Sequence, residues 1–323
     1  MKTLFSSIAI FLCLGAAPAY SASDFQPSKP VKLIVPFPPG GGTDSFARIL
    51  GDKLTELWHQ QVVVENRGGA QGSIGTAHAA KAAPDGYTLL LAHQGVFTVN
   101  PHLYKDTGFD PFRDFIPVGR GTQQPFVLVA NPSLPVKTLK ELAALAKKRP
   151  GELTFGSSSS GPQLAGELFK YTTGTDILHV SYKGAAPGVV DVLAGHIDLM
   201  VANPTSVSQH VKAGKLRALV LFGSEPLEDV LPGTPTAIDA GYPTLGDMPE
   251  WYGIVVPAGT PQNIVSQLNK DMNSALADAD VQKRIRGLGL LPSPSTPAEF
   301  ATQIRRDYER WGEMVKQAGV KAD

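Results

Sequence analysis

The sequence predicts an α/β fold of two lobes, with helices on both faces of parallel-rich sheets and a ligand cleft between the lobes. Short apolar runs alternate with amphipathic segments from residue 31 onward, which is the pattern of parallel sheets covered by helices. Two apolar runs end in turns rich in glycine or serine, at residues 40–42 and 156–161. Because ligands of such sheets bind at the carboxyl ends of strands, these turns predict two walls of one cleft.

Two short connections predict how the chain is divided between the lobes. Residues 121–125 and 223–226 contain glycine and proline between apolar runs, and they could carry the chain across and back. We expect residues 23–122 and 224–323 to form lobe 1 and residues 123–223 to form lobe 2. This organisation is typical of periplasmic binding proteins (type II-like), which close on a small ligand by a hinge motion.

Residues 1–22 have the pattern of a secretory signal peptide, with Lys2 followed by an apolar segment and then small residues. The apolar segment, Leu4 to Leu14, is too short to span a bilayer as a helix. Cys13 is the only cysteine and would be removed with the signal, so the mature chain would have no disulfide and no thiolate metal site. We therefore expect a protein of the bacterial periplasm; the alternative is a buried N-terminal helix.

Composition excludes several classes of partner. The chain has 29 basic and 29 acidic residues and no run of like charges, which argues against nucleic acid or an anionic membrane surface. A hydrophobic content of 42% suffices for one large or two medium domains. The histidines share no metal-ligand spacing, so we expect no metal site. We also expect no cofactor and a monomeric protein.

The first series of elements ends at residue 130. Apolar runs predict five strands: Val31–Val35, Val62–Glu65, Tyr87–Ala92, Ile116–Arg120 and Phe126–Ala130. Helices are predicted at Thr43–His59, where apolar side chains recur at helical spacing, and at Gln71–Ala82, which is rich in small residues.

The second series repeats the alternation. Amphipathic segments predict helices at Leu139–Lys148, Pro162–Thr173, Pro187–Ala194 and Val207–Ala213. Apolar runs predict strands at Leu153–Phe155, His179–Tyr182, Leu199–Ala202 and Leu216–Phe222.

The turn at residues 40–42 predicts an anion site. Three glycines join a buried strand to a helix that opens with Thr43 and Asp44. The free backbone N–H groups and the positive dipole end of that helix point at one place, which suits a carboxylate or a phosphate. The serine turn at 157–160 has the same form, with Pro162 in the first helical turn.

Catalytic motifs with glycine or serine do not match these turns. Residues 40–45 do not fit the dinucleotide pattern Gly-x-Gly-x-x-Gly, and no Gly-Lys-Ser/Thr follows them as in a phosphate-binding loop. Residues 156–160 fail the Gly-x-Ser-x-Gly pattern of a nucleophile elbow at the last position. A secreted hydrolase with an unusual serine site stays open as a rival to a binding protein.

Several motifs together resemble one family, the Bug-type extracytoplasmic solute receptors of tripartite tricarboxylate transporters (TctC family). The similarity extends from about residue 27 to residue 319 and is specific in combination. It is carried by Pro30 to Asp44 (PVKLIVPFPPGGGTD), Val62 to Gly68 (VVVENRG), Ala83 to Leu89 (APDGYTL), Asn100 to Tyr104 (NPHLY), Leu164 to Phe169 (LAGELF), His179 to Gly184 (HVSYKG), Lys212 to Ala218 (KAGKLRA) and Pro257 to Pro261 (PAGTP).

The resemblance implies a non-catalytic receptor that holds a carboxylate between its lobes and delivers it to membrane permease subunits. Carried over to this sequence, one side of the carboxylate site comprises Gly40, Gly41, Gly42, Thr43 and Asp44. The other side comprises Ser157, Ser158, Ser159 and Ser160. The far end of the ligand is expected to meet His93, Gln94, Ala185, Ala186, Asn203 and Thr205. For Asp44, capping of its own helix is the alternative to a water-mediated ligand contact.

The sequence departs from the family pattern where ligand identity is set. His93 and Gln94 stand where small residues are usual, Ala202 stands where many members carry an aspartate, and the serine loop is short. Without that aspartate the site lacks a partner for a ligand ammonium group, which disfavours an amino acid ligand. We expect a carboxylate without an amine, for example an aromatic mono- or dicarboxylate such as a phthalate isomer, with His93 as a cation near a second carboxylate. A sensor that presents its ligand to a signalling partner is the alternative role.

Overall fold

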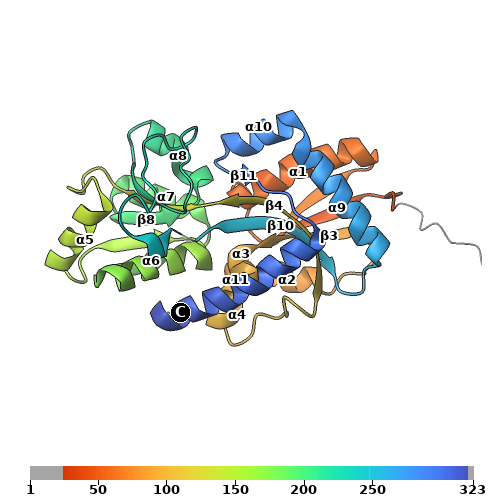
Figure 1. Ribbon diagram of the computed structural model, residues 1–323, viewed down its shortest axis with the longest axis horizontal. Coiled ribbons are helices and arrows are strands. Elements are labelled where there is room, and N and C mark those ends of the chain that lie inside the picture. Colours follow the sequence, from red (N-terminus) through yellow and green to blue (C-terminus); the bar gives the residue numbers. More distant parts are fainter. Residues whose placement is uncertain (1–24, 247, 319–323) are drawn as a thin grey trace, which may run out of the picture.

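A computed structural model describes residues 25–246 and 248–318 of the chain. The predicted signal peptide, residues 1–22, lies outside the described residues. Two mixed sheets, each covered by helices, form the two ends of an elongated molecule (Figure 1).

The first sheet has the strand order β11-β4-β10-β3-β1-β2. Its strands are β1 (Val31–Val35), β2 (Val62–Asn66), β3 (Thr88–His93), β4 (Phe115–Gln124), β10 (Glu250–Pro257) and β11 (Leu291–Pro292). β1 pairs in parallel with β2 and β3, as alternation with helices predicts. β10 instead pairs antiparallel with both β3 and β4, because it is the strand on which the chain returns from the second sheet.

The second sheet has the strand order β7-β6-β8-β5-β9. Its strands are β5 (Phe126–Ala130), β6 (Thr154–Ser157), β7 (Leu178–Ser181), β8 (Leu199–Ala202) and β9 (Arg217–Phe222). β6 pairs in parallel with β7 and β8, whereas β5 pairs antiparallel with β8 and β9. The carboxyl ends of β6 and β8 therefore lie at one edge, where their turns can share a ligand.

Helices bury their apolar faces against both sides of each sheet. On the first sheet, α1 (Gly42–Trp58), α9 (Gln262–Ala277) and α10 (Ala279–Gly287) cover one face. The other face is covered by α2 (Ser73–Ala79), α3 (Gln94–Thr98) and α11 (Pro297–Ala318), and the short α4 (Asn100–Leu103) follows α3. The second sheet lies between α5 (Leu139–Lys148) with α6 (Ser160–Thr173) and α7 (Ala185–Ala194) with α8 (Pro204–Lys212). The 3-10 turns η1 (Ala70–Gly72) and η2 (Pro243–Leu245) complete the elements.

The crossing between the sheets differs from the prediction. A strand ending at Arg120 and a connection at 121–125 were expected, but β4 continues to Gln124 because residues 122–124 pair with β10. Only Pro125 interrupts the chain before β5, since proline has no N–H for a sheet ladder.

The burial of residues after 223 favours a later return to the first sheet than residues 223–226. Leu227 and Leu231 are buried in the same cluster as β5 and α8, and Leu245 is buried with α6. These side chains belong to the core of the second sheet, although they follow residue 223. We therefore propose that the second lobe comprises residues 125–246 and 248 and that the rest of the described chain forms the first.

Two further differences concern helix starts. The helix predicted from Gln71 begins at Ser73, because Ala70 and Gln71 have φ of 45° and 53° and form a turn. The helices predicted from Pro162 and Pro187 begin two residues earlier, at Ser160 and Ala185. Proline is accepted in a first helical turn, so a proline does not mark the first residue itself.

Candidate functional site

A cavity of about 170 Å³ lies between the two lobes and is lined by residues of both. Ten of the predicted site residues line it: Gly40, Gly41, Gly42, Thr43 and His93 from the first lobe, and Ser158, Ser159, Ala185, Ala186 and Asn203 from the second. Gly184, Pro187 and Ser206, from the loops that the resemblance places at the far end of the ligand, also line it. Sequence reasoning did not include five further lining residues, namely Phe37, Pro38, Pro39, Lys183 and Tyr252. The glycine turn and the serine turn therefore do face each other across one space.

The glycine turn, residues 40–42, places the first turn of α1 against the cavity. Gly40 has a φ of 89°, a left-handed conformation that favours glycine. Gly41 is the N-cap of α1, and no side chain accepts a hydrogen bond from the first-turn N–H groups. Those donors are consequently free to hold an anion.

Three other helices begin at the same cavity without a side-chain cap. Their N-cap residues are Ser159 for α6, Gly184 for α7 and Asn203 for α8. Helix α5, whose N-terminus does not line the cavity, is capped by Thr138 and Glu141. Four uncapped helix N-termini converging on one space produce a positive potential from neutral groups, which favours a bound anion.

Asp44 does not line the cavity, so the structure assigns it a supporting position rather than a ligand contact. Its Oδ2 accepts hydrogen bonds from Gly40 N at 3.0 Å and Arg48 Nε at 3.1 Å, and its Oδ1 accepts one from Asn66 Nδ2 at 3.0 Å. Burial raises the pKa of Asp44, but hydrogen bonds from Arg48, Gly40 and Asn66 outweigh it and leave the pKa below the usual 3.8. The carboxylate thus ties the glycine turn to α1 and β2.

Replacing Asp44 by asparagine should therefore lower stability at neutral pH by about 1–2 kcal/mol, since charge-assisted hydrogen bonds to Gly40 and Arg48 are lost. A lowered pKa stabilises the fold above the unfolded value of 3.8, and this contribution disappears as the pH falls through the folded pKa. Thermal unfolding should show a lower Tm for the variant at pH 7 and a difference that shrinks below pH 3.8. A difference that is constant down to that range would contradict the assigned role.

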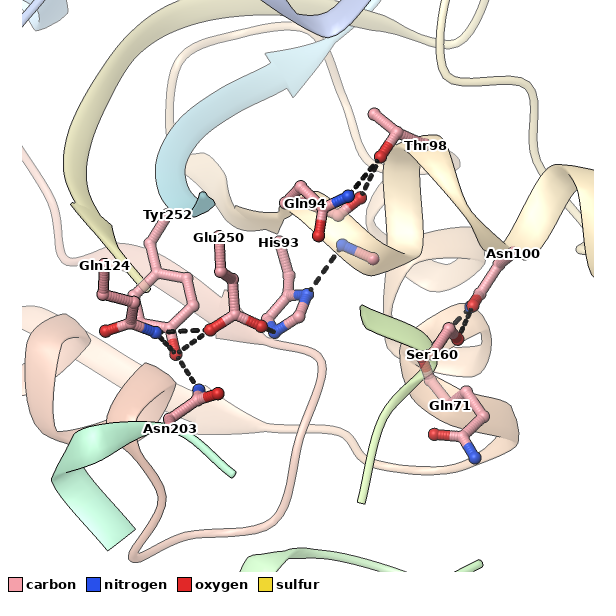
Figure 2. Close-up of polar contacts among 11 residues, drawn as sticks. Gln71, His93, Gln94, Thr98, Asn100, Gln124, Ser160, Asn203, Glu250 and Tyr252 are labelled. Carbon is pink, nitrogen blue, oxygen red and sulfur yellow. Dashed lines mark hydrogen bonds and ion pairs between the residues drawn. The ribbon is translucent and has the colours of Figure 1, made fainter. Parts of the chain in front are cut away.

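Four more predicted residues do not line the cavity, and three of them form hydrogen bonds elsewhere. Ser157 Oγ lies 2.8 Å from His179 Nε2, and Ser160 Oγ donates to Asn100 Oδ1. Gln94 is buried and donates to Thr98 Oγ1 at 2.7 Å (Figure 2). Thr205 Oγ1 is buried and has no hydrogen-bond partner among the described residues.

A buried polar network stands behind the far wall of the cavity. His93 is 2% exposed and caps α3, accepting a hydrogen bond from Gly95 N at Nδ1, 3.1 Å away. Its Nε2 lies 2.9 Å from Oε1 of Glu250, which is fully buried (Figure 2). An imidazole that accepts at Nδ1 carries its proton on Nε2 and is neutral. His93 is therefore not the cation that the sequence led us to expect.

Tyr252 joins the network to the second lobe. Its hydroxyl donates to Glu250 Oε2 at 3.0 Å and accepts from Gln124 Nε2 and Asn203 Nδ2, each at 2.7 Å. Burial, followed by the charge of Glu250, raises the pKa of Tyr252 well above its usual value. The Asn203 contact bridges the two lobes beside the cavity.

A second cavity of about 560 Å³ adjoins the first. The two share Phe37, Pro38, Ser158, Lys183 and Gly184, so the first cavity opens toward the second along this side.

Within residues 25–246 and 248–318, no group of three or more histidine, cysteine, aspartate or glutamate residues is arranged to hold a metal ion. No helix in the described part of the chain is both long enough and apolar enough to cross a bilayer.

Comparison with known proteins identifies the family. A family model for the tripartite tricarboxylate transporter family receptor matches residues 46–320. The chain belongs to this family. This receptor is 37% identical to protein BugT of Bordetella pertussis, with 99% of each chain covered. The family binds solutes and is not enzymatic, which removes the hydrolase alternative.

Solved structures share the fold over nearly the whole receptor. The periplasmic binding protein BugD is 34% identical with a TM-score of 0.85, covering 92% of this chain and 100% of that one. R. palustris Rpa4515 with adipate is 33% identical with a TM-score of 0.87, covering 91% and 99%. The two-lobed α/β architecture predicted from the sequence is confirmed.

Proposed function

We propose that this protein is a periplasmic receptor that binds a small organic carboxylate between its lobes and delivers it to the membrane permease subunits of a tripartite tricarboxylate transporter. The observation that carries the proposal is the convergence of four uncapped helix N-termini, α1, α6, α7 and α8, on one cavity. Family membership supports the same reading, as does the bound dicarboxylate named for the related Rpa4515 structure.

The carboxylate is proposed to lie between the glycine turn and the serine turn. Gly41, Gly42 and Thr43 would supply backbone N–H groups from the first lobe, and Ser158 and Ser159 would supply donors from the second. Each charge-assisted hydrogen bond contributes about 1.5–3 kcal/mol. Because each lobe holds only half of the donors, full affinity requires closure, and closure gives the permease a surface that exists only in the loaded receptor.

The body of the ligand is proposed to be apolar and aromatic. The rings of Phe37, His93 and Tyr252 line the cavity, with centroids 4.7 Å apart for Phe37 and His93 and 5.4 Å apart for His93 and Tyr252. The volume of about 170 Å³ is close to the roughly 150 Å³ of an engineered cavity that accepts benzene. A single six-membered ring therefore fits this space.

A thermal-shift screen of mono-, di- and tricarboxylates tests the proposal. Because a ligand at about a hundred times its Kd stabilises the folded state by about 2.7 kcal/mol, a cognate carboxylate should raise the Tm by several degrees. In Ser159→Ala the shift should shrink, with Kd about tenfold weaker. The matched Ser157→Ala variant should keep wild-type affinity, because Ser157 contacts His179 and not the cavity. If no organic anion raises the Tm, the proposed function is wrong.

A further inference from the structure

We propose that Glu250 is a specificity-determining residue, a buried negative charge that rejects ligands carrying a second anion at the end facing His93 and Tyr252. On this view the receptor selects monocarboxylates, and it differs in this respect from the relative with bound adipate, which is a dicarboxylate. The inference rests on the proposed carboxylate-binding function and names the substrate class of the same site.

The hydrogen bonds to Glu250 match those of an ionised carboxylate. Oε2 accepts hydrogen bonds from Tyr252 Oη and from Gln124 Nε2 (Figure 2). Oε1 lies 2.9 Å from His93 Nε2 but makes no hydrogen bond with the described residues. Both hydrogen-bonded neighbours, Tyr252 and Gln124, are donors to Oε2, so the carboxyl group acts as an acceptor, as the charged form does.

The charge of Glu250 is not neutralised by a cation. His93 is neutral because its Nδ1 accepts from Gly95 N. In the part of the chain that the structure describes, no lysine or arginine lies within 4.0 Å of Glu250. The network therefore holds one net negative charge with a side chain that is 0% exposed.

Only one layer of side chains separates this charge from the ligand. His93 and Tyr252 both line the cavity, and both contact Glu250 from behind. Inside a protein, two like charges repel far more strongly than in water, because the effective dielectric constant is lower. A second carboxylate placed against either ring would be repelled by Glu250.

The same two side chains have no hydrogen-bonding capacity left for a ligand. The Tyr252 hydroxyl makes one donated and two accepted hydrogen bonds, which is its full complement. His93 Nδ1 accepts from Gly95 N, and Nε2 faces Glu250 Oε1 at 2.9 Å. A carboxylate placed against these two rings would lose water without gaining a hydrogen bond from them, whereas an apolar ring has no such cost.

Lys183 is the charged side chain that could favour the opposite selectivity. It is exposed and lines both cavities from the second lobe. A ligand whose second carboxylate reached Lys183 would bind through it, and Glu250 would then be irrelevant to ligand charge. The test must therefore separate these two residues.

Matched ligand pairs make this separation. Isothermal titration of the mature protein compares benzoate with terephthalate and hexanoate with adipate, so that only the second carboxylate changes. Wild type should bind each monocarboxylate at least tenfold more tightly than its partner. Glu250→Gln keeps the side-chain size and removes the charge. It should therefore reduce the ratio of the dicarboxylate Kd to the monocarboxylate Kd about tenfold. Lys183→Met should leave the ratio unchanged.

Two outcomes would overturn the inference while leaving the proposed function intact. In the first, wild type binds a dicarboxylate as tightly as its matched monocarboxylate. In the second, Lys183→Met weakens dicarboxylates selectively while Glu250→Gln, with an unaltered circular dichroism spectrum, does not change the ratio. The comparison of wild-type affinities for matched mono- and dicarboxylates needs no variant, so it tests the inference even if Glu250→Gln does not fold. Absence of binding by any carboxylate would instead refute the function itself.

Discussion

Replacing Gly41 by valine should weaken carboxylate binding at least about a hundredfold while the fold stays intact. Gly41 lines the cavity and has φ of −90° and ψ of 175°, an extended conformation that any residue adopts. A Cβ built there would have Thr43 Oγ1, 3.9 Å away, as its nearest neighbour, so the protein itself has room for the side chain. The added methyl groups would occupy the place proposed for the carboxylate, and losing one or two charge-assisted hydrogen bonds corresponds to about that factor.

A matched substitution controls for the effect of valine on stability. Gly287, at the end of α10, has no atom within 4 Å of the position that an added Cβ would take, and it does not line the cavity. Calorimetry should show wild-type affinity for Gly287→Val and no measurable binding for Gly41→Val, with similar circular dichroism spectra for both. Wild-type affinity in Gly41→Val would contradict the proposed position of the carboxylate.

The anion-binding side of the site could be predicted because its chemistry is carried by the backbone. A strand, a glycine turn and a helix start are local features, and Gly40–Gly42 line the cavity as the sequence predicted. For the serine turn, the local sequence does not predict which side chains line the cavity. Four consecutive serines look equivalent in the sequence, but only Ser158 and Ser159 line the cavity. The partners of the other two, His179 and Asn100, come from distant parts of the chain.

The far wall could not be predicted because it is assembled by pairing across the sheet. Glu250 and Tyr252 lie on β10, in a region for which the sequence analysis predicted no element. β10 places Glu250 opposite Gln124 and places Tyr252 opposite His93. A single acidic residue at the start of an apolar run, Glu250 to Val256, was the available signal. A buried acid needs partners, so that pattern could have indicated a polar network.

Closure itself can be tested at the contact between Gly42 and Thr205, which come from opposite lobes. An alanine at position 42 would place its Cβ 2.8 Å from Thr205 Oγ1 and 3.2 Å from Tyr252 Oη. Neither neighbour moves easily, since threonine is stiff at χ1 and the tyrosine hydroxyl is held by three hydrogen bonds. The clash with Thr205, the closer of the two, needs both lobes in contact, so it should lower ligand affinity by about thirtyfold, or roughly 2 kcal/mol of overpacking.

A second substitution distinguishes impaired closure from a damaged ligand site. Thr205 does not line the cavity, and its Oγ1 has no hydrogen-bond partner among the described residues, so Thr205→Ala alone should leave affinity unchanged. Combined with Gly42→Ala it removes the closer of the two clashes and should restore most of the affinity, giving a coupling energy of about 1 kcal/mol or more in a double-mutant cycle. Small-angle X-ray scattering at saturating ligand should show an expanded Gly42→Ala receptor and a compact double variant. If the double variant binds no better than Gly42→Ala, the alanine acts on the carboxylate directly, and the contact between the lobes at Thr205 does not limit closure.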